Sequence, residues 1–293
     1  MVATAAVLFA VNGTVSKVLL EAGISSERLT QIRVTGALLA LAAVLVAVRP
    51  RALRVDVGEL PFLAIFGICA VALVQWFYFI AIHRLQIGIA LLIQYLAPLL
   101  VALWARFVMH EKVRARIWVA LGLALLGLSL VVEVWAGGAL DGLGVAASLM
   151  AAGTFAAYIL MAERGVGRRD PISLMWFGFL FAALFWAVIE PWWSFAARVV
   201  GDEVSLLGNL AGTRAPIWLL ICWMVLLGTV VPFVLIVGAL RHIPAARVAI
   251  IAMLEPVVAT GVAYAWLGET LGAPQLVGGA IVLGGILLAQ TAR

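Results

Sequence analysis

The chain consists of long apolar runs separated by short polar connections. Ten runs of about 20 residues cover positions 2–20, 28–48, 60–82, 86–109, 115–134, 142–162, 171–193, 215–240, 243–267 and 271–290. An α-helix rises about 1.5 Å per residue, so about 20 apolar residues cross the ~30 Å hydrocarbon core of a bilayer. The strands of a membrane barrel would instead alternate apolar and polar side chains over about ten residues. The runs therefore predict an all-α integral membrane protein with ten transmembrane helices.

Composition and charge support the same class. Of the 293 residues, 66% are hydrophobic and 11% are charged, whereas soluble domains carry about 25% charged residues to keep a surface in water. The net charge of +5 would also suit a nucleic-acid-binding protein. The basic residues are distributed by side of the membrane instead, so we expect no nucleic-acid partner.

The basic residues are unequally divided between the two sets of connections. With a cytoplasmic N-terminus, one side holds Arg49, Arg51, Arg54, Lys112, Arg114, Arg116, Arg164, Arg168, Arg169, Arg241 and Arg293, and the other holds Arg28, Arg84, Arg198 and Arg214. Eleven against four is the asymmetry of the positive-inside rule. It predicts a cytoplasmic face that contacts anionic lipid headgroups.

Neither cysteine suggests a disulfide or a metal site. Cys69 and Cys222 both fall within predicted spans and are interpreted as small packing residues. We expect no metal and no cofactor. The first segment lacks a basic leading region and carries Asn12 and Lys17, so it is expected to be a retained first helix rather than a cleaved signal.

The two halves of the chain repeat each other. "AIHRLQIGIALLIQYLAPLLVALWARFVMHEKV", from Ala81, aligns without a gap on "ALRHIPAARVAIIAMLEPVVATGVAYAWLGETL", from Ala239. The offset of 158 places Pro98 on Pro256 and Glu111 on Glu269. The matched helices are the fourth and the ninth, and an odd number of crossings between them means that the copies face opposite ways. The halves are residues 1–134 and 142–293, and inverted repeats around a midplane site are typical of secondary transporters.

These residues resemble a known family. The stretch from Pro98 to Glu111, the stretch "LEPVVATGVAYAWLGE" from Leu254 to Glu269, and Arg33 early in the second helix are similar to the EamA-like branch of the drug/metabolite transporter superfamily. The first copy departs from the usual pattern by reading "MHE" in place of "LGE". The resemblance implies two inverted five-helix repeats around a central cavity, a plasma-membrane location, both termini cytoplasmic, and export of small organic solutes such as amino acids.

Glu255 is the most deeply placed charged residue. It lies about 12 residues, or ~18 Å of helical rise, from the inner end of its run and so near the middle of the bilayer. A carboxylate there faces a wet cavity, pairs with a cation or stays protonated. Two interpretations stay open: exchange of a proton or contact with a solute amine, and a structural hydrogen bond between helices. The corresponding position of the first half is Ala97.

The repeated prolines and acids have local interpretations. Pro98 and Pro256 each remove a backbone hydrogen bond in mid-helix, which creates either a hinge or gate, or a static kink. Glu111 and Glu269 lie at the short connections before the fifth and tenth helices. Carboxylates there complement the positive end of the helix dipole, so both are interpreted as structural.

Other polar and aromatic side chains reach similar depths, and the resemblance places their helices around the cavity. They are Asn12, Gln75, Trp76, Tyr78, Gln94, Thr154 and Tyr158. Each is a candidate for the cavity wall, and each also suits contacts between helices. Lys17, Arg33 and Glu190 lie nearer the outer ends, where long basic side chains reach the headgroups; Lys17 and Arg33 also suit an outward cavity. Gly278, Gly279, Gly284 and Gly285 allow close helix packing, within the chain or between subunits.

The sequence disfavours three other classes of membrane protein. An ATP-driven pump would need a G-x-x-x-x-G-K-[ST] loop, and none occurs. An intramembrane enzyme acting on lipids or peptides would need convergent catalytic groups at depth. His83, His110 and His242 lie at helix ends instead, and no H-E-x-x-H or G-x-S-x-G occurs. A receptor would need neither an inverted repeat nor a midplane acid. The sequence favours a secondary carrier that is not an enzyme, driven by the solute gradient or by protons.

Overall fold

The computed structural model describes residues 1–84, 87–110, 112–131, 141–194, 197–268 and 272–291. The first half comprises α1 (Val2–Glu21), α2 (Ser26–Val48), α3 (Leu60–Ile65), a π-helical segment (Phe66–Ala72), α4 (Leu73–Arg84), α5 (Ile87–Gln94), α6 (Ala97–Phe107) and α7 (Ala115–Val131). The second half comprises α8 (Gly142–Val166), α9 (Pro171–Ile189), β1 (Glu203–Ser205), β2 (Arg214–Pro216), α10 (Ile217–Val225), a π-helical segment (Leu226–Val230), α11 (Val231–Ala239), α12 (Ala245–Ala252), α13 (Leu254–Val262), a π-helical segment (Ala263–Leu267) and α14 (Ala273–Thr291).

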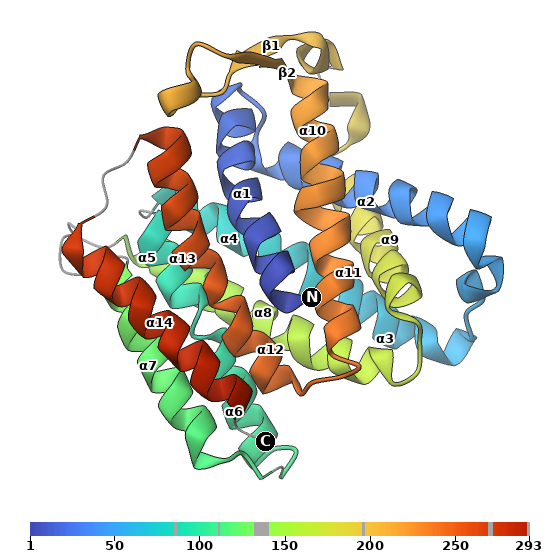
Figure 1. Ribbon diagram of the computed structural model, residues 1–293. Helices are drawn as coiled ribbons and strands as arrows, with labels where there is room; N and C mark the ends of the chain where they lie inside the picture. Colours follow the sequence, from blue (N-terminus) through green and yellow to red (C-terminus); the bar gives the residue numbers. More distant parts are fainter. Residues whose placement is uncertain (85–86, 111, 132–140, 195–196, 269–271, 292–293) are drawn as a thin grey trace.

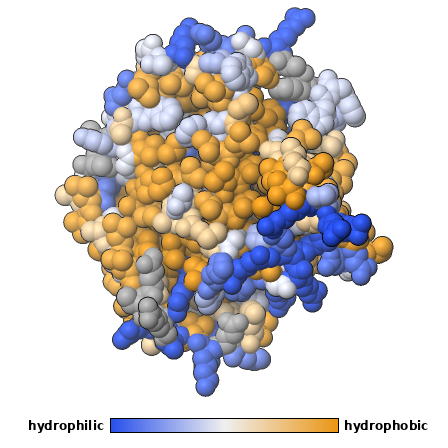
Figure 2. Space-filling model, turned by 45° about the vertical axis from the view of Figure 1, so that its right-hand side comes forward, coloured by the Kyte–Doolittle hydropathy of each residue, from blue (hydrophilic) through white to orange (hydrophobic). Residues whose placement is uncertain are grey.

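In the described part of the chain, each predicted apolar run is mostly helical. Eight helical segments of the described residues are long and apolar enough to cross a membrane, and α7 and α14 are shorter apolar helices. On the face shown in Figure 2, apolar residues cover most of the central surface. Large apolar side chains such as Val188 and Leu39 are 80% and 65% exposed, as expected of side chains that face lipid.

Short polar motifs set where several helices begin. The side chains of Ser25, Asp141 and Asp170 accept hydrogen bonds from the backbone N–H groups of Arg28, Gly144 and Ile172 at the starts of α2, α8 and α9. Such caps satisfy N–H groups that have no partner within the helix. Pro171 follows its cap at the first helical position, where a missing N–H is tolerated.

One part of the fold departs from the all-helical expectation. The connection between α9 and α10 contains an antiparallel hairpin, in which Glu203 pairs with Pro216 and Ser205 with Arg214. The hairpin extends the chain up to Pro216, so α10 begins at Ile217 rather than at 215. In Figure 1 it lies at the top of the bundle, and we call this the hairpin end.

The hairpin connection is attached to the last turn of the ninth predicted span. The Trp266 indole Nε1 donates to the Leu206 carbonyl at 2.7 Å, and the Asn209 amide donates to the Ala265 carbonyl at 3.2 Å. Gly208 has a φ of +51° and packs directly on the backbone of Trp266 and Leu267, where a Cβ would clash. Only glycine combines that backbone conformation with that approach.

The helices that contain Pro98 and Pro256 are interrupted at equivalent positions. α5 ends at Gln94 and α6 begins at Ala97, while α12 ends at Ala252 and α13 begins at Leu254. Each proline lacks the N–H that would bond the carbonyl four residues earlier, and the helix breaks just before it. With the offset of 158, the break at Tyr95 matches the break at Met253. The π-helical segments Phe66–Ala72 and Leu226–Val230 also overlap under this offset.

α7 and α14 lie side by side (Figure 1) and run antiparallel. A Cβ added at Gly278 would lie 2.5 Å from the Gly127 carbonyl oxygen, and one added at Gly285 would lie 2.8 Å from the Ala120 carbonyl oxygen. Gly127 corresponds to Gly285 under the offset, and Ala120 to Gly278, so the contact exchanges equivalent positions as a two-fold interface does. The close packing of Gly278 and Gly285 is therefore internal to the chain.

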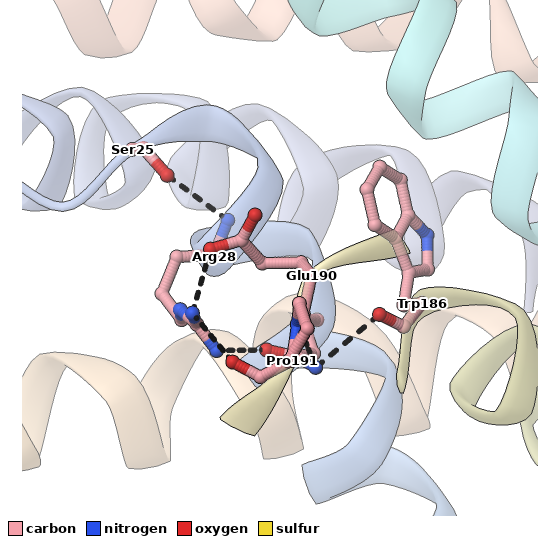
Figure 3. A network of polar contacts seen from close by, with 6 residues as sticks. Ser25, Arg28, Trp186, Glu190 and Pro191 are labelled. Atoms are coloured by element: carbon pink, nitrogen blue, oxygen red, sulfur yellow. Dashed lines mark hydrogen bonds and ion pairs between the residues drawn. The ribbon is translucent and has the colours of Figure 1, made fainter. Parts of the chain in front are cut away.

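α2 and α9 form a second antiparallel pair, joined at both ends. At the hairpin end, Figure 3 shows Arg28 and Glu190 pointing toward each other; Arg28 Nη2 lies 2.6 Å from Glu190 Oε1. Arg28 also donates to Gln31 Oε1 and to the Pro191 carbonyl, and Gln31 donates to the Glu190 carbonyl at 2.5 Å. At the opposite end, Arg49 pairs with Asp170 at 3.0 Å. The polar ends fix the register of two helices whose middles are apolar.

Candidate functional site

A cavity of about 1200 Å³ enters the molecule from the hairpin end. Its lining includes the turn between α1 and α2, from Glu21 at the end of α1 to Glu27 at the start of α2. Its walls come mainly from α1, α4 and α13, of which α1 and α13 lie side by side in Figure 1. Phe9, Arg33 and Glu255 line its deeper part. The cavity thus joins one face of the bundle to the level of the helix breaks.

Glu255 is held at the break between α12 and α13. Its Oε2 accepts a hydrogen bond of 2.8 Å from the hydroxyl of Tyr95, and Tyr95 itself lies at the equivalent break between α5 and α6. The two interrupted helices are therefore joined by one contact between their breaks. Tyr95 is 1% exposed, so a single buried donor orients a carboxylate that also reaches the cavity.

Arg33 is the second charged group of the deep site. Its side chain is buried, and its Nε donates to Thr229 Oγ1 at 2.7 Å while Nη2 donates to the Gly228 carbonyl at 3.0 Å. Gly228 and Thr229 belong to the π-helical segment Leu226–Val230, and Thr229 Oγ1 in turn donates to the Met224 carbonyl. The altered helical register presents a hydroxyl and a carbonyl on one side, which suits the planar guanidinium. Arg33 therefore points into the protein and does not reach for headgroups.

Asn12 lies beside this arginine site. Its side chain is 3% exposed and lines the cavity, and its Oδ1 has no hydrogen-bond partner among the described residues. The amide packs on Gly228 so closely that a Cβ at position 228 would clash with it. A buried acceptor without a partner is costly. The Asn12 amide packs against the π-helical segment beside the cavity wall.

Aromatic rings separate the deep end of the cavity from the opposite face of the molecule. Phe9 contacts Phe233 with ring centroids 5.2 Å apart, Phe233 contacts Tyr158 at 5.4 Å, Tyr158 contacts Phe155 at 6.3 Å, and Phe155 contacts Tyr95 at 6.2 Å. This series of rings comes from α1, α8, α11 and the α5–α6 break. Among the described residues, these rings form a continuous series of aromatic contacts that begins at the cavity wall with Phe9.

The structure brings some of the predicted cavity residues together and places others in packing positions. Asn12, Tyr78, Glu255 and Pro256 line the cavity. Pro98 is buried beside the break in the other repeated helix, away from the cavity wall.

The remaining predicted wall residues lie off the cavity. Trp76 packs edge-on against Trp186, Tyr158 belongs to the series of rings, and the Thr154 hydroxyl bonds to the Met150 carbonyl of its own helix. The Gln75 amide and Gln94 Oε1 are buried among other side chains, without partners in the described part of the chain. Depth along a helix indicates the level of a side chain but leaves open which way it points.

Glu111 and Glu269 were predicted to cap helices, and no metal site was expected. Glu111 and Glu269 lie outside the described residues, so their proposed capping roles stay predictions. Within the described residues, no three His, Cys, Asp or Glu side chains are grouped so as to hold a metal ion.

Tyr95 and Thr229 are site residues that the sequence did not single out, whereas Arg33 was left with the headgroups or an outward cavity as alternatives. The repeat alignment contained a signal for Tyr95, since the break before Pro256 predicts an equivalent break before Pro98. Nothing in the sequence indicates that the helix around Thr229 takes a π-helical register.

Comparison with known proteins identifies the family. The family model described as the EamA-like transporter family matches residues 1–133 and again residues 142–291. The chain belongs to the EamA-like transporter family. Its two matched segments agree with a helical, multi-pass membrane protein of the drug/metabolite transporter superfamily.

Relatives extend the family likeness over most of the chain. An uncharacterized transporter of Archaeoglobus fulgidus is 30% identical over 250 residues, which is 83% of this chain and 81% of the relative. A solved structure, described only as a crystal structure of protein, covers 98% of this chain and 93% of its own, with a TM-score of 0.78 and 18% identity. At that identity the solved structure supports the EamA-like fold alone. The family and the relative support a membrane transporter.

Proposed function

We propose that the protein is a secondary carrier that exports small zwitterionic solutes such as amino acids or related amphipathic molecules. The observation that carries this proposal is the cavity at the hairpin end, which is lined by Arg33, Asn12 and Glu255. A transport site needs access from one face at a time, together with groups that recognise a solute at depth. An enzyme acting on a lipid or peptide is the alternative, and no observation favours it.

The charges of the deep site suit a molecule with one acidic and one basic end. Arg33 uses Nε and Nη2 for Thr229 and Gly228, which orients the guanidinium and leaves Nη1 to receive a carboxylate. The Glu255 carboxylate is the acceptor for an ammonium group. A neutral apolar solute would leave these groups without compensation in a low-dielectric site.

The transport mechanism that we propose is alternating access, in which two inverted five-helix halves exchange conformations. The antiparallel α7–α14 contact, the matched breaks at Tyr95 and Met253, and the overlapping π-helical segments support such a relation. The breaks beside Pro98 and Pro256 are the proposed hinges. By the distribution of basic residues, the hairpin end is extracellular and both termini are cytoplasmic at the plasma membrane.

Energy comes from the solute gradient or from protons, because the sequence has no phosphate-binding loop for ATP. Glu255 is the proposed proton carrier, since among the described residues its hydrogen-bond partner is the neutral hydroxyl of Tyr95 rather than a fixed cation. Protonation would remove the negative charge from the deep site and weaken its hold on an ammonium group.

The test is exchange of labelled amino acids by the purified protein in liposomes, with and without a pH gradient. We expect Glu255→Gln to keep the acceptor for Tyr95 but to reduce exchange at least tenfold and to abolish its dependence on the pH gradient. Glu203→Gln, at an exposed hairpin position, is the matched control and should leave exchange unchanged. Wild-type exchange and pH dependence in Glu255→Gln would refute the role of this carboxylate.

A further inference from the structure

A second, smaller cavity lies at the end of the bundle opposite the hairpin. Its volume is about 200 Å³, compared with about 1200 Å³ for the large cavity. Its walls come from the end of α6 and the start of α7, and from the end of α8 and the start of α12. It shares no lining residue with the large cavity.

The two cavities are lined by equivalent positions of the two halves. Ala105 and Ile117 line the small cavity. The residues 158 positions later are Ala263 and Gln275, and both line the large cavity. The element pairs also correspond, because the end of α6 and the start of α7 match the end of the α13 segment and the start of α14. Equivalent walls at opposite ends are what an inverted repeat produces when one mouth is open and the other is closed.

A specific contact closes the small cavity. The Glu163 side chain of α8 accepts a hydrogen bond of 2.7 Å through Oε1 from the backbone N–H of Ala245, the first residue of α12. A carboxylate at this point satisfies an N–H that the helix cannot satisfy and complements the helix dipole. Pro244, just before Ala245, offers no side-chain cap of its own. Glu163 thus fastens the start of α12 to α8 across the cavity.

We propose that the small cavity is the inner mouth of the translocation path in its closed state, and that Glu163 is the latch that holds it closed. This inference rests on the proposed carrier function. When the mouth opens, the Glu163–Ala245 contact breaks and α12 moves away from α8. The freed carboxylate then faces Lys112, Arg114 and Arg247, which line the same cavity, so its charge is not left uncompensated.

The latch makes a reciprocal prediction about access to the two mouths. In protein that lacks Cys69 and Cys222, Ala105→Cys reports on the inner mouth and Ala263→Cys on the outer mouth. Both are labelled with a membrane-impermeant maleimide, in inside-out and right-side-out vesicles respectively. Adding Glu163→Ala should raise inner labelling about tenfold and lower outer labelling, because both report one equilibrium and the lost hydrogen bond is charge-assisted. Glu163→Gln keeps an acceptor and should restore most of the original pattern.

Other outcomes overturn the proposal. If inner labelling rises while outer labelling stays constant, α12 frays locally and Glu163 is not a latch. If neither labelling changes, the Glu163 contact does not keep the inner mouth closed. A second variant leaves Glu163 intact: Ala105→Trp adds a ring too large for the closed cavity and should also lower outer labelling of Ala263→Cys. Labelling requires no solute, so it tests the two mouths independently of transport. Reciprocal labelling in a protein that does not exchange amino acids would refute the proposed function but still support the two alternating mouths.

Discussion

At the scale of single residues, the site depends on buried polar groups that fix one another. Glu255 was predictable from the sequence because a carboxylate in mid-membrane is rare and has few stable environments. Its partner was not, because tyrosine is common in apolar helices and its hydroxyl direction depends on the break before Pro98. For Arg33 the sequence left two environments open. Its depth allowed its side chain to reach either the headgroups or the interior, and only the hydroxyl and carbonyl of the π-helical segment decide between them.

The Tyr95–Glu255 contact makes a prediction about stability. Tyr95→Phe removes one hydroxyl and keeps the ring that packs on Phe155. We expect the free energy of unfolding in detergent to fall by about 1.5–3 kcal/mol, the usual range for a hydrogen bond to a charged group. Tyr264→Phe, at an exposed position, is the matched control and should change it by less than about 0.5 kcal/mol. Equal stability of the two variants would show that the contact does not join the helices.

At the scale of elements, the positions of the helices were predictable and their interruptions were only partly so. The ten runs could be identified because each crossing of a bilayer requires an apolar segment of a minimum length. The two proline-linked breaks followed from the chemistry of proline. The three π-helical segments carry no sequence pattern that distinguishes them from α-helix. The hairpin was missed because strands of three residues have too few side chains to show alternation.

The α7–α14 pair gives a test of close packing with a control on the same helix. Gly285→Ala would place a methyl group 2.8 Å from the Ala120 carbonyl oxygen, whereas Gly284 has no atom within 4 Å of the added Cβ. Overpacking should make Gly285→Ala less stable by about 1–3 kcal/mol. Gly284→Ala should be neutral or up to about 1 kcal/mol more stable, because alanine is the better helix former. Thermal unfolding of both variants measures the difference. Destabilisation of both by the same amount would contradict the assigned contact.

At the scale of the whole molecule, the inverted relation of the halves was predicted from a proline and a glutamate at matched spacing. The structure adds three relations of the same offset: the breaks, the π-helical segments and the exchanged α7–α14 contact. The charges do not share this symmetry, since Glu255 is matched by Ala97.

Orientation in the membrane is testable with two reporters in the cysteine-free protein. Ala211→Cys lies in the exposed hairpin connection and Arg51→Cys in the exposed connection after α2. By the positive-inside rule, an impermeant maleimide should label Ala211→Cys on intact cells and Arg51→Cys only after the membrane is opened. The reverse pattern would invert the assignment of the two mouths and turn the proposed exporter geometry around.

The hairpin connection is attached to one wall of the large cavity. Leu206, Gly208 and Asn209 are fastened to the residues that follow α13, and Ala263 and Leu267 of that same segment border the large cavity. Any swing of that wall must carry the hairpin along. An antibody fragment raised against these hairpin residues would consequently follow, or arrest, the movement proposed for the deep site.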